Sequence, residues 1–152
     1  MQFLKKTIYP LMLGFVLMAM MTATAFSADA AKAVKTEAPK PARSIVVTYF
    51  HNTMRCPTCH KIEEQSTQAI KSHFEKELST GKLVFRVINV DEPANEHYNT
   101  DYQLYTKSLI VSEVRDGKEV RWKNLEKIWE VVHDEEQFDN YVYTEIKDWL
   151  KE

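Results

Sequence analysis

The pattern of hydrophobic and polar positions along residues 44–152 predicts β-strands that are separated by helices. Two runs, Ser44–Phe50 and Leu83–Val90, are rich in β-branched and aromatic residues, which is typical of buried strands. The stretch between them, from Cys56 to about Leu78, carries apolar residues at helical spacing. The other predicted elements, in chain order, are a helix from Pro93 to about Tyr105, a strand over Leu109–Val114, its partner over Glu119–Lys123, a short helix over Leu125–Val132 and a last helix from Asp134 to about Leu150.

This order of elements, β-α-β-α-β-β-α, predicts the α/β fold class. The first two strands and the helix that connects them are expected to form a parallel, right-handed unit. The Asp116-Gly117 pair between the last two strands is a strong signal for an antiparallel hairpin. Together these connections predict a central, mixed four-stranded sheet that is flanked by helices.

The N-terminal segment has the pattern of a secretory signal. Lys5 and Lys6 precede the apolar run Ile8–Met21, and small residues that suit cleavage follow it. The predicted organisation is a signal peptide at 1–28, a flexible Ala/Lys/Pro linker at 29–43 and a folded domain at 44–152. A cleaved signal predicts a periplasmic or secreted protein. An uncleaved one predicts a membrane anchor, because the segment is nearly long enough to span a bilayer.

Charge and cysteine content narrow the classes of function. The 152 residues include 20 Lys and Arg against 22 Asp and Glu, which gives a formal net charge of -2. No basic excess is available to displace counterions from phosphates, so we expect no nucleic-acid partner. Two cysteines are too few for a disulfide-rich scaffold, but they suffice for one bridge, one redox pair or part of a metal or haem site.

The candidate chemistry lies in Cys56-Pro57-Thr58-Cys59, at the predicted start of the first helix. Unpaired backbone N–H groups and the helix dipole stabilise a thiolate there, and Arg55 adds a positive charge, so we expect a low pKa for the Cys56 thiol. Cys59 lies on the same helical face, where its thiol can attack a mixed disulfide formed at Cys56. Pro57 suits the first helical position, and together with Thr58 it is expected to tune the redox potential.

Three other uses of the same cysteines remain open. A static structural disulfide is one, although a bridge that closes so short a loop gains little chain entropy. Cys56 to His60 also match the C-x-x-C-H signature of c-type haem attachment, with His60 as the iron ligand. The preceding strand counts against haem, as does the position of Met54, which is too close to Cys56 to reach the opposite haem face. The stronger alternative is a thiolate carrier of copper or arsenite, with Cys56, Cys59 and His60 as ligands.

The chain resembles the thioredoxin-like superfamily over residues 44–152. The resemblance is carried by V-V-T-Y-F before C-P-T-C, by I-N-V-D at Ile88–Asp91 and by Tyr102-Gln103-Leu104 before the hairpin. More narrowly, Y-F-H-x-x-x-R-C-x-T-C, N-V-D-E-P-x-N-E-H and D-Y-Q-L-Y are similar to a small family catalogued as nitrophenyl compound nitroreductase subunit and associated with arsenic-resistance gene clusters. No glycine loop for a flavin or nicotinamide is visible, so we expect no cofactor, and the resemblance by itself does not imply a nitroreductase activity.

The resemblance implies thiol–disulfide exchange with protein thiols or disulfides, or with a membrane electron donor. Such folds place a cis-proline opposite the two cysteines, and here Ser108 occupies that position. The acidic residue that is usually buried behind the second cysteine also lacks a counterpart, with Phe50 or a neighbour at that strand end. We therefore expect His51, His60 or water to accept the proton of Cys59.

Overall fold

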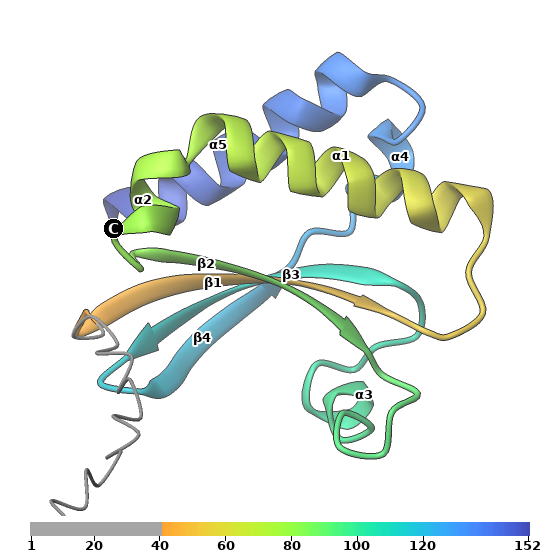
Figure 1. Cartoon of the computed structure of the whole chain (residues 1–152), viewed down its shortest axis with the longest axis horizontal. Coiled ribbons are helices and arrows are strands. Elements are labelled where there is room, and N and C mark those ends of the chain that lie inside the picture. Colours follow the sequence, from red (N-terminus) through yellow and green to blue (C-terminus); the bar gives the residue numbers. More distant parts are fainter. Residues whose placement is uncertain (1–40) are drawn as a thin grey trace, which may run out of the picture. The chain divides into compact units, whose positions relative to one another are not determined.

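The fold of residues 41–152 is described by a computed structural model (Figure 1). The predicted signal peptide at 1–28 and residues 29–40 of the predicted linker lie outside the described residues. The first strand, β1, spans Arg43–His51, so it begins at the last position that the sequence assigns to the linker. Within residues 41–152, no helix is both long and apolar enough to cross a membrane.

Four strands form one mixed sheet in the order β2-β1-β3-β4. Strand β1 runs parallel to β2, Leu83–Asn89, and antiparallel to β3, Ser108–Arg115. At the far edge, β3 is antiparallel to β4, Lys118–Asn124. The predicted α/β class and its mixed four-stranded sheet are therefore confirmed.

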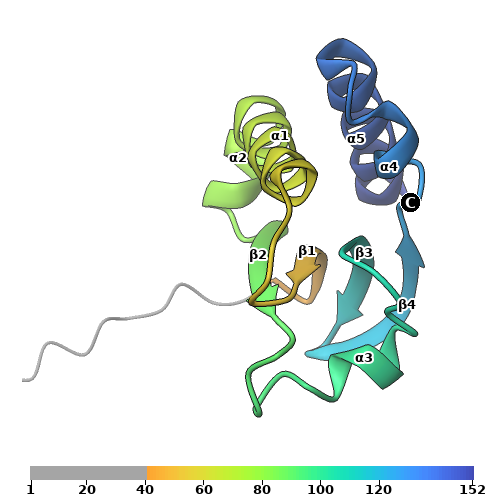
Figure 2. The same cartoon turned by 90° about the vertical axis from the view of Figure 1, so that its right-hand side faces the viewer.

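The long helices cover one face of this sheet, as Figures 1 and 2 show. Helix α1 spans Pro57–His73 and is followed by α2 over Glu75–Ser79. The short helix α4, Ile128–Val131, precedes α5, Glu135–Lys151. The α5 helix is capped by the side chain of Asp134, where the sequence predicts its start.

Alternate side chains of β1 contribute to two hydrophobic clusters. Ile45, Val47 and Tyr49 are fully buried in the larger cluster, between the sheet and the long helices. Phe50 belongs to a smaller cluster that includes Ile110. Because consecutive strand residues point to opposite faces of a sheet, the end of β1 presents Tyr49 to the α1 side and Phe50 to the other side.

The segment from Pro93 to Tyr105 is not the continuous helix that its sequence predicts. It forms a series of turns, and helix α3 covers only Tyr98–Asp101, on the face of the sheet opposite α1 and α5 (Figure 2). Local polar contacts compete with helix formation, because the Asn95 side chain donates to the Asn89 carbonyl oxygen at 3.0 Å. The left-handed backbone of Gln103, with φ 52°, then ends the helical geometry.

The first predicted helix is interrupted at Phe74, which separates α1 from α2. This residue leaves helical geometry, with φ -128° and ψ 29°. Its side chain is buried, and its ring centroid lies 5.7 Å from that of Tyr143 in α5. Burial of a large aromatic side chain against α5 thus outweighs continuation of the helix.

The predicted hairpin between β3 and β4 is confirmed. Asp116 and Gly117 both have positive φ, 50° and 78°, which suits a tight turn between twisted antiparallel strands. The Asp116 N–H also donates to the carbonyl oxygen of Ala42 at 2.8 Å, so the turn contacts the residue that precedes β1.

A buried carboxylate joins the sheet to the C-terminal helix. The side chain of Glu113, in β3, is 1% exposed and accepts hydrogen bonds from Arg43, Arg115 and Arg121. Arg43 also donates to the Trp149 carbonyl oxygen in α5 at 2.7 Å. Hydrogen bonds from Arg115 and then from Arg43 outweigh burial, and they lower the pKa of Glu113 from its ordinary 4.5 to about 2.

We expect Glu113 to contribute to acid unfolding. A carboxyl whose pKa is lowered by folding stabilises the folded state fully above its ordinary pKa of 4.5, and it loses that contribution as the pH falls toward about 2. The Glu113→Gln variant should be less stable at neutral pH by about 2 kcal/mol, because three guanidinium groups lose their carboxylate. Its stability should also fall less steeply below pH 4.5. Urea unfolding at a series of pH values measures both effects.

The exposed Glu96 provides the matched control, because its side chain makes no hydrogen bond or ion pair within residues 41–152. The Glu96→Gln variant should follow the wild-type pH profile. Parallel profiles for wild type and Glu113→Gln would contradict the proposed role of the carboxylate.

Candidate functional site

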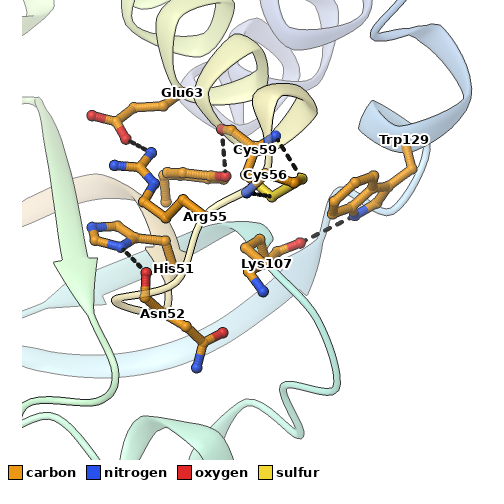
Figure 3. The surroundings of a disulfide bond; sticks show 9 residues. His51, Asn52, Arg55, Cys56, Cys59, Glu63, Lys107 and Trp129 are labelled. Atoms are coloured by element: carbon orange, nitrogen blue, oxygen red, sulfur yellow. Dashed lines mark hydrogen bonds and ion pairs between the residues drawn. A yellow bond between two sulfur atoms is a disulfide. The ribbon is translucent and has the colours of Figure 1, made fainter.

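The Cys56-Pro57-Thr58-Cys59 motif lies after the carboxyl end of β1, at the start of α1, as the sequence predicts (Figure 3). Cys56 is the N-cap of the helix, with an extended backbone of φ -85° and ψ 162°. Pro57 occupies the first helical position, where its missing N–H costs no helical hydrogen bond. The parallel pairing of β1 with β2 thus delivers the helix start, and the motif with it, to one end of the sheet.

The two cysteines form a disulfide, and they differ in exposure. Their Cα atoms are 5.1 Å apart. Cys56 is exposed, whereas Cys59 is 2% exposed and lies within the core. A thiol or disulfide that approaches the site therefore meets Cys56 first, and Cys59 is placed to react only with its neighbour.

Backbone N–H groups point at both sulfur atoms. The Cys59 N–H donates to Cys56 Sγ at 3.2 Å, and the Cys56 N–H donates to Cys59 Sγ at 3.3 Å. The first of these is the capping interaction of α1, with sulfur in the role that serine or aspartate oxygen usually takes. The same donor, together with the helix dipole, stabilises negative charge on Cys56 once the disulfide is reduced.

The positive charge of Arg55, which the sequence predicts to activate Cys56, is balanced by a nearby carboxylate. Its guanidinium forms an ion pair with Glu63, one turn and a half into α1, and lies 5.9 Å from the centroid of the Tyr49 ring. The Arg55 side chain is 15% exposed, so this pair is partly shielded from solvent. The electrostatic field at Cys56 therefore depends on Glu63 as well as on Arg55.

Tyr49, and not Phe50, occupies the space behind the second cysteine. The Tyr49 hydroxyl donates to the Cys59 carbonyl oxygen at 2.8 Å, in a fully buried position. Burial raises the pKa of Tyr49 to about 12, against a smaller opposite effect of Arg55. The hydroxyl therefore stays protonated at neutral pH and anchors the start of α1, while the Phe50 ring packs on the other face against Tyr98 and Tyr102.

Neither candidate histidine forms a hydrogen bond with a cysteine sulfur within the described residues. His51 Nδ1 lies 2.9 Å from the Asn52 carbonyl oxygen, and its ring is half-buried near that of Tyr49. His60 is exposed on α1, beside Glu63 and Glu64. Across residues 41–152, no group of three or more His, Cys, Asp and Glu side chains is arranged to hold a metal ion. The tuning roles predicted for both histidines, and for Thr58, stay predictions.

Ser108, at the position predicted to replace a cis-proline, is the first residue of β3. It is buried opposite Phe50 in the β1–β3 register, and its hydroxyl donates to the Thr106 carbonyl oxygen at 3.0 Å. The preceding residue, Lys107, is among the residues that surround the disulfide in Figure 3. Its carbonyl oxygen accepts a hydrogen bond from Trp129 Nε1 at 3.1 Å, which joins the start of β3 to α4.

Four residues of these surroundings make contacts that the sequence did not predict. Tyr49 had a usable signal, because it continues the alternation of Ile45 and Val47 toward the helices. The others have no local signature, since their contacts join residues that are far apart in the sequence or on different elements. They are Glu63, Lys107 and Trp129.

No protein-family model matches the chain, and no curated protein matches it. Solved structures of thioredoxins are similar to it. A thioredoxin of Fasciola hepatica is 24% identical, covering 59% of this chain and 79% of that one, with a TM-score of 0.36. The germline-specific thioredoxin Deadhead of Drosophila melanogaster is 20% identical, covering 53% of this chain and 67% of that one, with a TM-score of 0.37. The oxidised thioredoxin of Plasmodium falciparum is 16% identical, covering 59% of this chain and 79% of that one, with a TM-score of 0.36.

We expect the Glu63→Gln variant to make Cys56 reactive at lower pH. Removing the carboxylate takes away a negative charge near the thiolate and leaves the Arg55 guanidinium uncompensated, and both changes favour the thiolate. The pH midpoint for alkylation of Cys56 by iodoacetamide in the reduced protein should fall by about 0.5 to 1.

Glu64→Gln is the matched control, because it removes the same charge from the adjacent, exposed position without touching Arg55. Its midpoint should change far less than that of Glu63→Gln. Equal midpoints for the two variants would show that the ion pair with Arg55 has no special effect on the thiol.

Proposed function

We propose that the chain is an exported, thioredoxin-like thiol–disulfide oxidoreductase that acts through Cys56 and Cys59. The observation that carries this function is the asymmetry of the pair. Cys56 is exposed at the N-cap of α1 and its sulfur accepts a backbone N–H, whereas Cys59 lies buried directly behind it. One sulfur is thus placed to attack a substrate and the other to resolve the product.

The reaction requires two successive displacements at sulfur. The Cys56 thiolate attacks one sulfur of a substrate disulfide, the substrate S–S bond breaks, and one substrate thiolate leaves. Cys59 then loses its proton to water, and its thiolate attacks Cys56 Sγ. The Cys56–Cys59 bond forms and the second substrate thiolate leaves. Two electrons pass from the dithiol to the substrate, and the reverse sequence oxidises a substrate dithiol.

The surrounding residues support these steps without joining in the transfer of electrons. The Cys59 N–H stabilises charge on Cys56 both as attacking thiolate and as leaving group. Water serves as proton acceptor in this scheme, because burial holds Tyr49 in its protonated form and neither His51 nor His60 bonds to a sulfur within residues 41–152. The only bond between His60 and a cysteine in that range is the helical one from its backbone N–H to the Cys56 carbonyl oxygen.

The proposed export of the protein and its proposed partners are supported by the sequence. The charged and then apolar N-terminal segment supports a periplasmic or secreted location, where disulfides form and persist. Exported protein thiols or disulfides, or a membrane electron donor, are the partners of such a dithiol. The similarity to the small family catalogued as nitrophenyl compound nitroreductase subunit adds no reaction, because the exchange needs only the two cysteines.

The Cys59→Ala variant should trap a mixed disulfide. After reduction and exposure to glutathione disulfide, Cys56 should hold one glutathione, because no neighbouring thiol remains to release it. The Cys56→Ala variant is the matched control, and it should react slowly because Cys59 is shielded. Mass spectrometry of the intact protein measures both products. Equal labelling of the two variants, or no labelling of Cys59→Ala, would contradict the proposed exchange.

The redox potential of the pair fixes the direction of the physiological reaction. Equilibration of the purified protein with glutathione buffers measures it. A value near or below about -250 mV identifies a reductant that needs an electron supply, and a value near about -120 mV identifies an oxidant of exported thiols. A protein whose thiols cannot be titrated after reduction, because metal or haem holds them, would contradict the function.

A further inference from the structure

A cleft of about 360 Å³ lies between the start of β3, the end of β4 and helix α4. Four aromatic side chains line it: Tyr102, Tyr105, Trp122 and Trp129. Two of these rings are unusually accessible, since Tyr105 is 95% and Trp122 is 38% exposed. Exposed aromatic side chains gathered around a cleft mark a binding site more often than a surface without a partner.

The cleft adjoins the disulfide. Trp129 lines the cleft and is also among the residues that surround the disulfide in Figure 3, where it lies on the side away from Glu63. Its indole N–H is fixed by the Lys107 carbonyl oxygen. A polypeptide whose sulfur has reached Cys56 can therefore place a nearby side chain in this cleft.

Most of the aromatic wall is held in place before any ligand arrives. The Tyr102 ring meets that of Trp122 edge-on, with centroids 5.3 Å apart. The Tyr102 hydroxyl donates to Glu119 at 2.6 Å, and the ring also packs against Phe50, with centroids 5.2 Å apart. Because these contacts fix the rings, little side-chain entropy is lost when a ligand binds.

The charge of the lining is negative. Glu126 is the charged residue among those that line the cleft, and its carboxylate forms no ion pair within residues 41–152. Two of the neighbouring cations are engaged elsewhere, since Lys123 pairs with Glu145 and Lys127 lies over the Tyr141 ring. Asn124 also lines the cleft, but its side-chain oxygen is buried and has no hydrogen-bond partner among the described residues.

We propose that this cleft is a specificity subsite for an arginine side chain of the protein substrate, close in sequence to the cysteine that exchanges with Cys56. Aromatic faces attract a cation, and the carboxylate of Glu126 supplies two acceptor oxygens. A guanidinium stacks on aromatic rings and offers five donors, which fits this lining better than a compact ammonium does. The subsite deepens the proposed exchange reaction and depends on it.

Cysteine-containing peptides test the subsite. Each peptide is presented as a disulfide with a neutral thiol, and it carries either arginine or citrulline at one to four positions from its cysteine. Citrulline keeps the shape of arginine without its charge. At the best spacing, the reduced full chain should exchange with the arginine peptide about fivefold to tenfold faster than with the citrulline peptide.

Glu126→Gln and Trp122→Leu should bring this ratio close to one. The ratio within each variant cancels any change in the reactivity of the thiols themselves. Glu130→Gln is the matched control, because Glu130 is exposed on α4, four residues after Glu126, and does not line the cleft. It should keep the wild-type ratio.

Hydroxyethyl disulfide, which is small and neutral, separates the two proposals. Reaction with this probe but no preference for arginine at any spacing would overturn the subsite and leave the exchange reaction intact. A faster reaction of a leucine peptide, unaffected by Glu126→Gln, would also overturn it, because the cleft would then be an apolar site. No reaction with the neutral probe would contradict the exchange reaction itself.

Discussion

The hydrogen bond from the Cys59 N–H to Cys56 Sγ is the contact on which the site depends. It caps α1, so the start of the helix and the reactive sulfur are fixed by the same group. A helix N-terminus always leaves backbone N–H groups without a helical partner, and a sulfur placed there satisfies one of them. The Cys59 N–H therefore both caps the helix and stabilises negative charge on the Cys56 sulfur.

The core then makes the two sulfurs unequal. Strand β1 is buried on both faces, and Tyr49 at its end joins the larger hydrophobic cluster while its hydroxyl bonds to the Cys59 carbonyl oxygen. This bond anchors the first turn of α1 to the strand below it, with Cys59 inside and Cys56 outside. The difference in exposure between the two cysteines is thus a consequence of how the first turn of α1 packs on β1.

The charged side chains on the two flanks of the disulfide differ in their ion pairing. Arg55 is paired with Glu63 on one flank of the disulfide, and farther away three arginines surround Glu113. On the other flank, within residues 41–152, the Glu126 carboxylate has no cationic partner and stands beside exposed aromatic rings. An uncompensated charge at the edge of a cleft is available to a ligand, whereas a compensated one mainly holds the protein together.

The sequence by itself determined the α/β order, the two central strands, the hairpin at Asp116-Gly117 and the motif at the start of a helix. These features depend on local propensity, on residue spacing and on turn chemistry, which neighbouring residues decide. The helix expected after Pro93 and the continuous first helix were wrong, because side-chain hydrogen bonds and the burial of Phe74 override local preference. Only the tertiary structure decided that Glu63 pairs with Arg55, that Trp129 bonds to Lys107 and that four aromatic side chains line one cleft beside the disulfide. Such contacts depend on how the helices and loops pack on the sheet, so no local pattern encodes them.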